Sequence, residues 1–371
     1  MTDVRFEWET PEDWHRIETL DAHTGGEPFR IVTDGYPAIE GETLLEKRRY
    51  VQEHLDEYRR ALMWEPRGHA DMYGALLVEP DDPAADVGVL FTHNDGYSTM
   101  CGHGIIALGT VLPEAGFETR SPDELVIQTP AGLVTARPKW APSRSDDRAT
   151  RVERVSFENV PSFVVARDET IDVPDVGAVT VDVAFGGAFY AFCEASQFDL
   201  ALDATDYRRQ IELGRSIKRT VADALEDRIV HPTEDDLSFL YGTIFTGPPL
   251  NDGVGNRRSD DTSEGEKPTG VGADSRNVCV FADGEVDRCP TGTGVSARLA
   301  LERDAGRLDP GDPFVVESIV GSRFTGRILD ERSFDGHDAV VPEVTGSAHV
   351  VGRNEWLIDP DDPFGTGFFL R

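Results

Sequence analysis

The stretch Met100-Cys101-Gly102-His103-Gly104 decides the fold, because the chain repeats its pattern once, at Pro290-Thr291-Gly292-Thr293-Gly294. In each copy a glycine-rich turn precedes an apolar run, which predicts helices from Ile105 to Ala115 and from Val295 to Ala305. Aligned without gaps, the copies also match further on, at Ala107 and Ala297, Ala115 and Ala305, and Gly116 and Gly306. The final glycine pair is placed to close the two helices. The repeat therefore predicts one structural unit used twice.

Both turns lie where a predicted helix begins. A helix N-terminus offers unpaired backbone N–H groups and a partial positive charge, which bind a carboxylate and lower the pKa of a nearby thiol. Two such termini related by a pseudo-twofold axis would hold one small carboxylate and present Cys101 and Thr291 to opposite faces of its α-carbon. A single copy would be explained as well by helix capping and a buried cysteine. The matching pair favours a ligand site.

Charge and composition exclude several classes of partner. With 371 residues the chain has room for two domains, and its formal net charge of −33 argues against binding to nucleic acid or to an anionic membrane. Four lysines stand against 32 arginines. This pattern favours a cytoplasmic protein of a halophile, where a screening length of about 3 Å in molar salt removes self-repulsion; an acidic mesophile protein is the alternative. No apolar run approaches the roughly 20 residues of a membrane span.

Strands outnumber helices in the predicted order of elements, which favours an α+β fold with the ligand between two halves. Residues 1–15 are predicted to form a loosely held acidic arm, and residues 251–271 a flexible acidic insertion. The first half is predicted to comprise residues 16–151 and 345–371, and the second half residues 152–344. Long helices are expected at Thr43–Leu62 and Asp206–Arg228, and the second repeat helix is followed by predicted runs at Phe314–Arg327, Val340–Val351 and Trp356–Ile358. Cys193 and Cys279 lie in apolar strands and are predicted to pack in the core.

Motifs along the chain give the sequence a resemblance to a known family. They are His23-Thr24-Gly25-Gly26-Glu27-Pro28, Arg67-Gly68-His69-Ala70-Asp71-Met72, Met100-Cys101-Gly102-His103, Phe245-Thr246-Gly247-Pro248-Pro249, Asp287-Arg288-Cys289-Pro290-Thr291-Gly292-Thr293-Gly294, Glu317-Ser318-Ile319-Val320-Gly321-Ser322-Arg323-Phe324-Thr325-Gly326 and Glu343-Val344-Thr345-Gly346-Ser347. The set resembles the proline racemase family, which includes hydroxyproline epimerases and trans-3-hydroxy-L-proline dehydratases. The resemblance implies a diaminopimelate epimerase-like fold, in which two pseudo-symmetric halves each wrap a curved sheet around a central helix.

The resemblance also implies roles for residues of the repeat. Cys101 would be a catalytic base, and Asp287 would contact the ring nitrogen of a small-molecule substrate, hydroxyproline or proline. The substrate carboxylate would lie on the backbones of Gly102, His103, Gly292 and Thr293. Preorganised N–H donors of this kind stabilise the negative charge that forms when the α-proton leaves. The family's reaction requires neither a metal nor an organic cofactor, and a homodimer is left open.

One departure from the family pattern points to the reaction. Racemases and epimerases of the family carry a second cysteine where this chain has Thr291, and a hydroxyl does not replace a thiolate as a base near neutral pH. Threonine there resembles the trans-3-hydroxy-L-proline dehydratases, in which Cys101 would remove the α-proton and the 3-hydroxyl would leave as water, giving 1-pyrroline-2-carboxylate. A second departure is Cys289, where the family usually has serine. The alternatives are a proline racemase or 4-hydroxyproline epimerase that uses Cys101 and Cys289, and a non-catalytic imino-acid-binding protein.

Overall fold

The computed structural model describes residues 8–142, 151–250 and 272–370. The predicted insertion at 251–271 lies outside these residues, as does half of the predicted arm. The helices are α1 (Leu44–His54), α2 (Asp56–Met63), α3 (Gly102–Glu114), α4 (Tyr207–Ala224) and α5 (Gly292–Asp304), with short 3-10 turns at Ala195–Phe198, Ala204–Asp206 and Asp235–Leu237. Two of these helices, α3 and α5, follow directly from the repeated motif.

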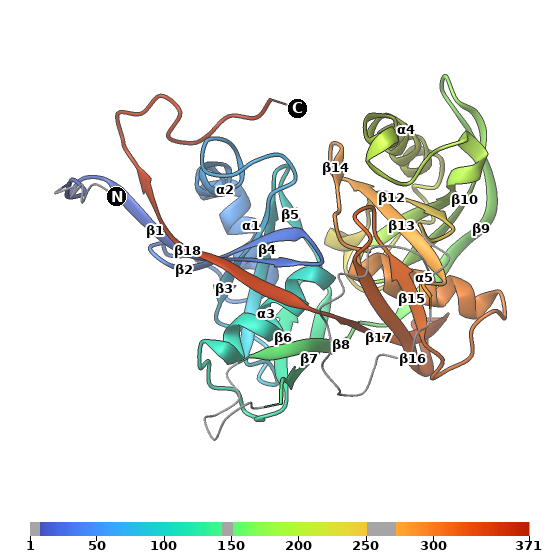
Figure 1. The fold of residues 1–371 in the computed structure, drawn as a ribbon, viewed down its shortest axis with the longest axis horizontal. Coiled ribbons are helices and arrows are strands. Elements are labelled where there is room, and N and C mark those ends of the chain that lie inside the picture. The colour runs from blue at the N-terminus through green and yellow to red at the C-terminus, as the bar shows by residue number, and fades with distance from the viewer. Residues whose placement is uncertain (1–7, 143–150, 251–271, 371) are drawn as a thin grey trace, which may run out of the picture.

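The strands form one continuous sheet that curves around both of these helices (Figure 1). In chain order they are β1 (His15–Thr24), β2 (Glu27–Asp34), β3 (Tyr73–Val78), β4 (Val87–His93), β5 (Tyr97–Ser98), β6 (Leu125–Thr129), β7 (Gly132–Trp140), β8 (Val152–Glu158), β9 (Ser162–Val173), β10 (Gly177–Phe185), β11 (Phe189–Glu194), β12 (Leu240–Gly247), β13 (Ser275–Phe281), β14 (Glu285–Val286), β15 (Phe314–Glu317), β16 (Arg323–Phe334), β17 (His337–Gly346) and β18 (Ala348–Ile358). The predicted α+β content is confirmed.

The helix α3 is the centre of one half of the molecule. Residues Gly102 to Leu112 are all buried, and strands β1, β7, β8 and β18 pack against them. A helix that is apolar on every side is stable only when its surroundings cover every side. The sheet supplies that cover here, so the start of α3 is held at a fixed place.

The helix α5 takes the same place in the other half, where β9, β10, β16 and β17 pack around it. The two helices end alike. Gly116 and Gly306 have φ angles of 81° and 66°, and in each helix the next residue bonds back, from Phe117 N–H to Leu112 and from Arg307 N–H to Glu302. Each of these is one bond of a Schellman motif, and the second bond runs from the Gly116 N–H to Pro113 and from the Gly306 N–H to Arg303. The glycine closure predicted from the repeat is confirmed.

The two halves are joined through their strands. β8 hydrogen-bonds to β7 on one side and to β17 on the other, while β17 also pairs with β9 and β16. β18 then returns the chain to the first half as the partner of β1. Because this seam is continuous, the predicted division at residues 151 and 344 stays a prediction.

Three predicted elements are wrong in their extent. The helix expected over Thr43–Leu62 is two helices, because Leu55 leaves helical geometry at φ −127° and ψ 13° and a new turn starts at Asp56. The run at Phe314–Arg327 is broken by the turn between β15 and β16, and that at Val340–Val351 by the step from β17 to β18. Apolar patterning continues across both breaks, so it did not reveal them.

Within the described ranges, none of the helices combines the length and the apolar character that spanning a membrane would require.

Candidate active site

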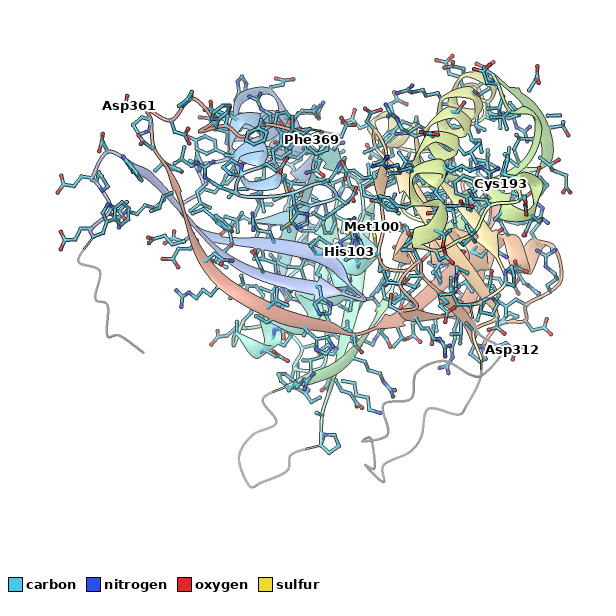
Figure 2. The ribbon with its side chains drawn as sticks, turned by 45° about the horizontal axis from the view of Figure 1, so that its top comes forward. Met100, His103, Cys193, Asp312, Asp361 and Phe369 are labelled. Atoms are coloured by element: carbon cyan, nitrogen blue, oxygen red, sulfur yellow. The ribbon has the colours of Figure 1, made fainter. Side chains whose placement is uncertain are left out.

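The two repeated turns meet in the middle of the molecule. A side chain added at Gly102 would place its Cβ 2.6 Å from the Cα of Gly292, and one added at Gly292 would lie 2.8 Å from the Cα of Gly102. Backbone therefore touches backbone, and glycine is required on both sides of the contact. Figure 2 shows the labelled Met100 and His103 at this central position, apart from Cys193 in the second half.

Cys101 occupies the N-cap position of α3. Its sulfur accepts a hydrogen bond from the backbone N–H of Gly104 at 3.2 Å, which satisfies one of the free donors of the first turn. The Sγ atom also lies 3.2 Å from Nδ1 of His103, and the residue is 4% exposed. The thiol is thus held by its own helix and points into the contact between the halves.

The sequence predicted that the helix terminus would lower the pKa of this thiol, and the terminus acts in that direction, but burial outweighs it. Burial raises the pKa of Cys101 well above its ordinary value, and the nearby Asp287 raises it further. The Gly104 N–H acts in the predicted direction but does not offset the loss of water. A positive charge close to the sulfur would favour the thiolate.

His103 is an uncharged imidazole beside that thiol. It is 3% exposed, and burial lowers its pKa to about 3. The ring meets Tyr73 edge-on at 4.8 Å between centroids and Phe29 at 5.6 Å. Thr24 anchors the backbone of the same residue by donating its hydroxyl to the His103 carbonyl at 2.8 Å. The two aromatic contacts and the backbone hydrogen bond together hold the ring against Cys101.

Thr291 begins α5 with a different geometry. Its φ is 65° and its ψ is 94°, a conformation that a β-branched residue rarely adopts. The hydroxyl does not cap the helix and instead donates a hydrogen bond to Asp287. Burial raises the pKa of Asp287 to about 7, although the bond from Thr291 and the charge of Arg288 lower it. The carboxyl group is therefore poised between its charged and neutral forms.

Ionisable residues surround Asp287 and act on its pKa. The guanidinium of Arg288 lies 2.6 Å from the Oδ2 atom of Asp71, and its backbone N–H donates to Glu27 at 2.6 Å. Glu27 is fully buried, and burial together with the charge of Asp287 raises its pKa. The motifs around Glu27 and Asp71 were part of the family resemblance, but no role was predicted for these two side chains.

All seven predicted site residues line one narrow cavity between the helix starts. They are Cys101, Gly102, His103, Asp287, Thr291, Gly292 and Thr293. The remaining walls are Met100 and three tyrosines that the sequence analysis missed, Tyr73, Tyr190 and Tyr241. Tyr190 shares a hydrogen bond of 2.7 Å with the Thr293 hydroxyl, and Tyr73 one of 3.1 Å with Tyr241. The tyrosines lie in or beside apolar strands, where their sequence pattern indicates only core packing.

Cys289 does not line this cavity, yet its sulfur is near. One ligand atom each of His103, Asp287 and Cys289 lies within 4.8 Å of the others. Thr291 already donates its backbone N–H to the sulfur at 3.3 Å and its hydroxyl to Asp287. Because both groups have these partners, and because burial raises the pKa of Cys289, the cluster suits a substrate site better than a metal centre.

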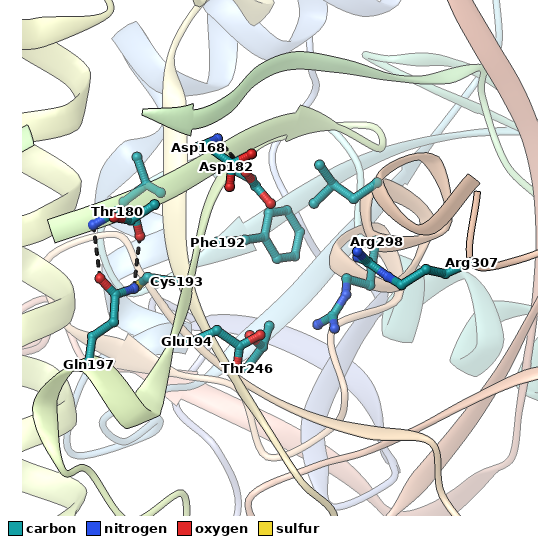
Figure 3. A pocket seen from close by; sticks show the side chains of 12 residues that line it. Asp168, Thr180, Asp182, Phe192, Cys193, Glu194, Gln197, Thr246, Arg298 and Arg307 are labelled. Carbon is teal, nitrogen blue, oxygen red and sulfur yellow. Dashed lines mark hydrogen bonds between the residues drawn. The ribbon is translucent and has the colours of Figure 1, made fainter. Parts of the chain in front are cut away.

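A second hollow lies elsewhere in the second half and has a different character (Figure 3). Its walls carry acidic side chains, among them Glu194, together with Arg298 and Arg307. Both arginines pair with Glu302, and the Gln197 amide bonds to the backbone of Thr180. None of the predicted site residues reaches this hollow, so we assign it no role in the reaction.

With the site described, comparison with known proteins identifies the family. The family model described as Proline racemase matches residues 19–369. The chain belongs to the proline racemase family. A relative from Colwellia psychrerythraea named "Trans-3-hydroxy-L-proline dehydratase" is 42% identical, with 99% of this chain and 98% of the relative covered. A relative from Burkholderia multivorans named "3-hydroxyproline 2-epimerase" is 43% identical, with 96% of this chain and 98% of the relative covered.

Solved structures of the proline racemase family share the fold. The structure of a hydroxyproline epimerase from Agrobacterium vitis, with bound trans-4-hydroxy-L-proline, superposes with a TM-score of 0.82 at 30% identity, covering 97% of this chain and 96% of that chain. The predicted epimerase-like fold is confirmed. The roles of the individual site residues remain predictions.

Proposed function

We propose that this member of the proline racemase family is a trans-3-hydroxy-L-proline dehydratase. The observation that carries the proposal is the asymmetry of the cavity. A thiol, Cys101, stands at the start of α3, whereas the start of α5 presents the hydroxyl of Thr291, which is already bonded to Asp287. One face of a bound α-carbon thus meets a group that can become a strong base, and the other face does not. Relatives that carry the dehydratase name over nearly their full length support the same choice.

In this proposal the substrate carboxylate lies between the two helix starts, on the backbone N–H groups of Gly102, His103, Gly292 and Thr293. The ring ammonium faces Asp287. Cys101 removes the α-proton, and the charge that develops on the carboxylate is stabilised by donors that need no reorganisation. The 3-hydroxyl leaves as water, and the enamine tautomerises to 1-pyrroline-2-carboxylate.

The ring ammonium would also favour the thiolate form of Cys101, which burial disfavours. Burial raises the pKa of Cys101, and a cation a few ångströms away would lower it again. The base would therefore form when substrate is bound. This order protects the thiol from reaction with other electrophiles.

The second candidate is an epimerase, and one observation favours it. The Cys289 sulfur lies within 4.8 Å of ligand atoms of Asp287 and His103, and one relative of similar identity is named "3-hydroxyproline 2-epimerase". In this candidate Cys289 would protonate the face opposite Cys101. Against it, the sulfur accepts the Thr291 N–H and lies outside the cavity walls.

The test is to incubate the purified protein separately with trans-3-hydroxy-L-proline, trans-4-hydroxy-L-proline and L-proline. A dehydratase should give 1-pyrroline-2-carboxylate from the first substrate alone. This cyclic imine can be detected with a dye that reacts with imines and by its mass. Change of optical rotation without loss of water, abolished by Cys289→Ser, would replace the dehydratase with the epimerase. Binding of all three without turnover would leave a binding protein.

A further inference from the structure

The stereochemistry of the proposed substrate restricts where the leaving group can be protonated. In trans-3-hydroxy-L-proline the carboxylate and the hydroxyl lie on opposite faces of the ring, so the α-hydrogen and the hydroxyl lie on the same face. If Cys101 removes that hydrogen, the hydroxyl departs on the Cys101 side. Thr291 is then on the wrong face to assist, and its hydroxyl is already committed to Asp287. The acid must be sought beside Cys101.

His103 is the side chain that the geometry places there. Its Nδ1 and Nε2 atoms lie 3.2 Å and 3.6 Å from the Cys101 sulfur, and the ring lines the cavity. The residue is only 3% exposed, and Tyr73 and Phe29 pack edge-on against its ring. Family resemblance gave this residue a backbone role only. The side chain has none so far.

We propose that His103 is a second catalytic residue, whose imidazole accepts the thiol proton of Cys101 and delivers a proton to the departing 3-hydroxyl. The inference rests on the proposed dehydratase function. In the first step the S–H bond breaks and an N–H bond forms on the imidazole, while the sulfur forms a new S–H bond to the α-hydrogen. The electron pair of the α-C–H bond stays on the α-carbon and is delocalised onto the carboxylate.

In the second step the C2–C3 double bond forms as the C3–O bond breaks, and the imidazolium proton goes to the oxygen. Water and the enamine leave, and the site returns to a neutral thiol beside a neutral imidazole. No external acid, base or oxidant is consumed. Cys101 and His103 therefore end each cycle in the protonation states in which they began. A syn elimination permits this, because the α-hydrogen and the hydroxyl leave from the same face of the ring.

The burial of the pair suits this chemistry. Burial lowers the pKa of His103 to about 3, which makes its protonated form a strong acid toward a poor leaving group. Burial raises the pKa of Cys101, which makes its thiolate a strong base. Neither ion is favoured without a ligand, but the substrate brings a cation for the thiolate and a carboxylate for the imidazolium.

Tyr73 is the rival donor on this side of the cavity. Its hydroxyl shares a hydrogen bond with Tyr241 at 3.1 Å, and burial raises its pKa well above the ordinary value. A phenol with a raised pKa is a weaker acid than an imidazolium with a lowered one. The structure therefore favours His103.

The experiment compares two leaving groups. Chloride departs without a proton, whereas hydroxide requires one, so trans-3-chloro-L-proline is tested beside trans-3-hydroxy-L-proline in H103Q and in the unmutated enzyme. We expect H103Q to lower turnover of the hydroxyl substrate by about 10²–10⁴-fold and that of the chloride substrate by at least about tenfold less. An equal fall for both substrates, or full activity toward the hydroxyl substrate, would overturn the proposal.

Controls separate this outcome from others. Binding of pyrrole-2-carboxylate reports that H103Q keeps its cavity, and H231Q, which alters a buried histidine remote from the cavity, should leave the ratio of the two rates unchanged. If Y73F changes the ratio and H103Q does not, the acid is Tyr73. If the unmutated enzyme forms no 1-pyrroline-2-carboxylate at all, the dehydratase proposal fails instead.

A measurement on the unmutated enzyme serves if the variants do not fold. With His103 as the acid, a solvent-derived proton reaches the leaving oxygen, so D₂O should slow the hydroxyl substrate more than the chloride substrate. If Cys101 alone returned the α-proton to the oxygen, this difference would be absent. Its absence would overturn the role of His103.

Discussion

The starts of α3 and α5 are two copies of one repeated unit. Both helices are buried, both begin at a glycine that touches the other copy, and both end in the same Schellman motif. At the N-cap they differ. Cys101 has extended geometry, with φ −139° and ψ 103°, and caps its own helix through sulfur, whereas Thr291 has φ 65° and bonds away from its helix to Asp287.

This difference shows that exchanging a thiol for a hydroxyl changes more than one functional group. The cysteine sulfur is bonded to its own helix, whereas the threonine hydroxyl is bonded to the Asp287 carboxyl group, which we propose faces the substrate nitrogen. A non-glycine residue at such a φ costs about 1–3 kcal/mol, which the surrounding contacts must offset. In the proposed reaction, one copy thus provides the base and the other provides the site for the ring ammonium.

Removing the thiol should have the largest effect. We expect Cys101→Ser to lower kcat by at least about 10³-fold, because a serine hydroxyl is a far weaker base. Pyrrole-2-carboxylate should still bind, since the backbone N–H groups remain, and calorimetry would measure this. Retained turnover would remove Cys101 from the mechanism and make the two copies functionally alike.

The carboxyl group bonded to Thr291 should give the site its pH dependence. The pKa of Asp287 is raised to about 7, so the carboxylate is lost as pH falls through 7. Binding of L-proline, a zwitterion whose ring ammonium would face Asp287, should then weaken by up to about tenfold per pH unit below 7.

Calorimetric titrations at several pH values would measure this dependence. Asp287→Asn should bind L-proline weakly at every pH, and pyrrole-2-carboxylate, which has no ammonium group, should show little dependence in either protein. A flat profile for L-proline in the unmutated protein would contradict the assignment of Asp287.

The shared glycine contact should respond equally from both sides. Gly102→Ala and Gly292→Ala each place a Cβ under 3.0 Å from opposing backbone, and we expect each to lower the free energy of unfolding by about 1–3 kcal/mol. Gly96→Ala is a matched control, because nothing lies within 4 Å of its added Cβ. Thermal unfolding would compare the three, and an unchanged melting temperature in either contact variant would mean that the halves can separate freely.

Making the copies chemically alike should have the smallest effect. Thr291→Cys places a second thiol at a helix start, and we expect weak epimerisation of L-proline or trans-4-hydroxy-L-proline, followed by chiral chromatography. The effect should be weak because the φ of 65° turns the side chain toward Asp287 instead of capping the helix. Thr291→Ser should show none. Epimerisation by the unmutated protein would instead favour Cys289 as a second base.

The sequence predicted the frame of this site well, because a repeat reports on structure twice. The two helices, their closing glycines and the meeting of seven predicted residues in one cavity all follow from matching two short motifs. The burial of Cys193 and Cys279 was also predicted correctly. The halophile interpretation and the homodimer stay predictions, since they depend on composition and on contacts between chains.

The remaining errors come from properties that depend on the assembled fold. The net rise in the pKa of Cys101 was not predicted, because the effect of a helix terminus is local, whereas burial depends on the assembled fold. Tyr73, Tyr190 and Tyr241 read as core residues because their hydroxyl partners lie far away along the chain. The positive φ of Thr291 has no signal in its residue type, since threonine disfavours it.

The bare contact between Gly102 and Gly292 also sets the terms on which the two copies can diverge. Since neither position has room for a side chain, a substitution at one is harmful whatever stands at the other, and no compensating change at its counterpart can restore the space. The preceding positions, 101 and 291, carry no such mutual restraint. In a duplicated unit, substitutions are therefore not tolerated where the copies touch but are tolerated one residue away. New chemistry can arise at that neighbouring position without a new fold.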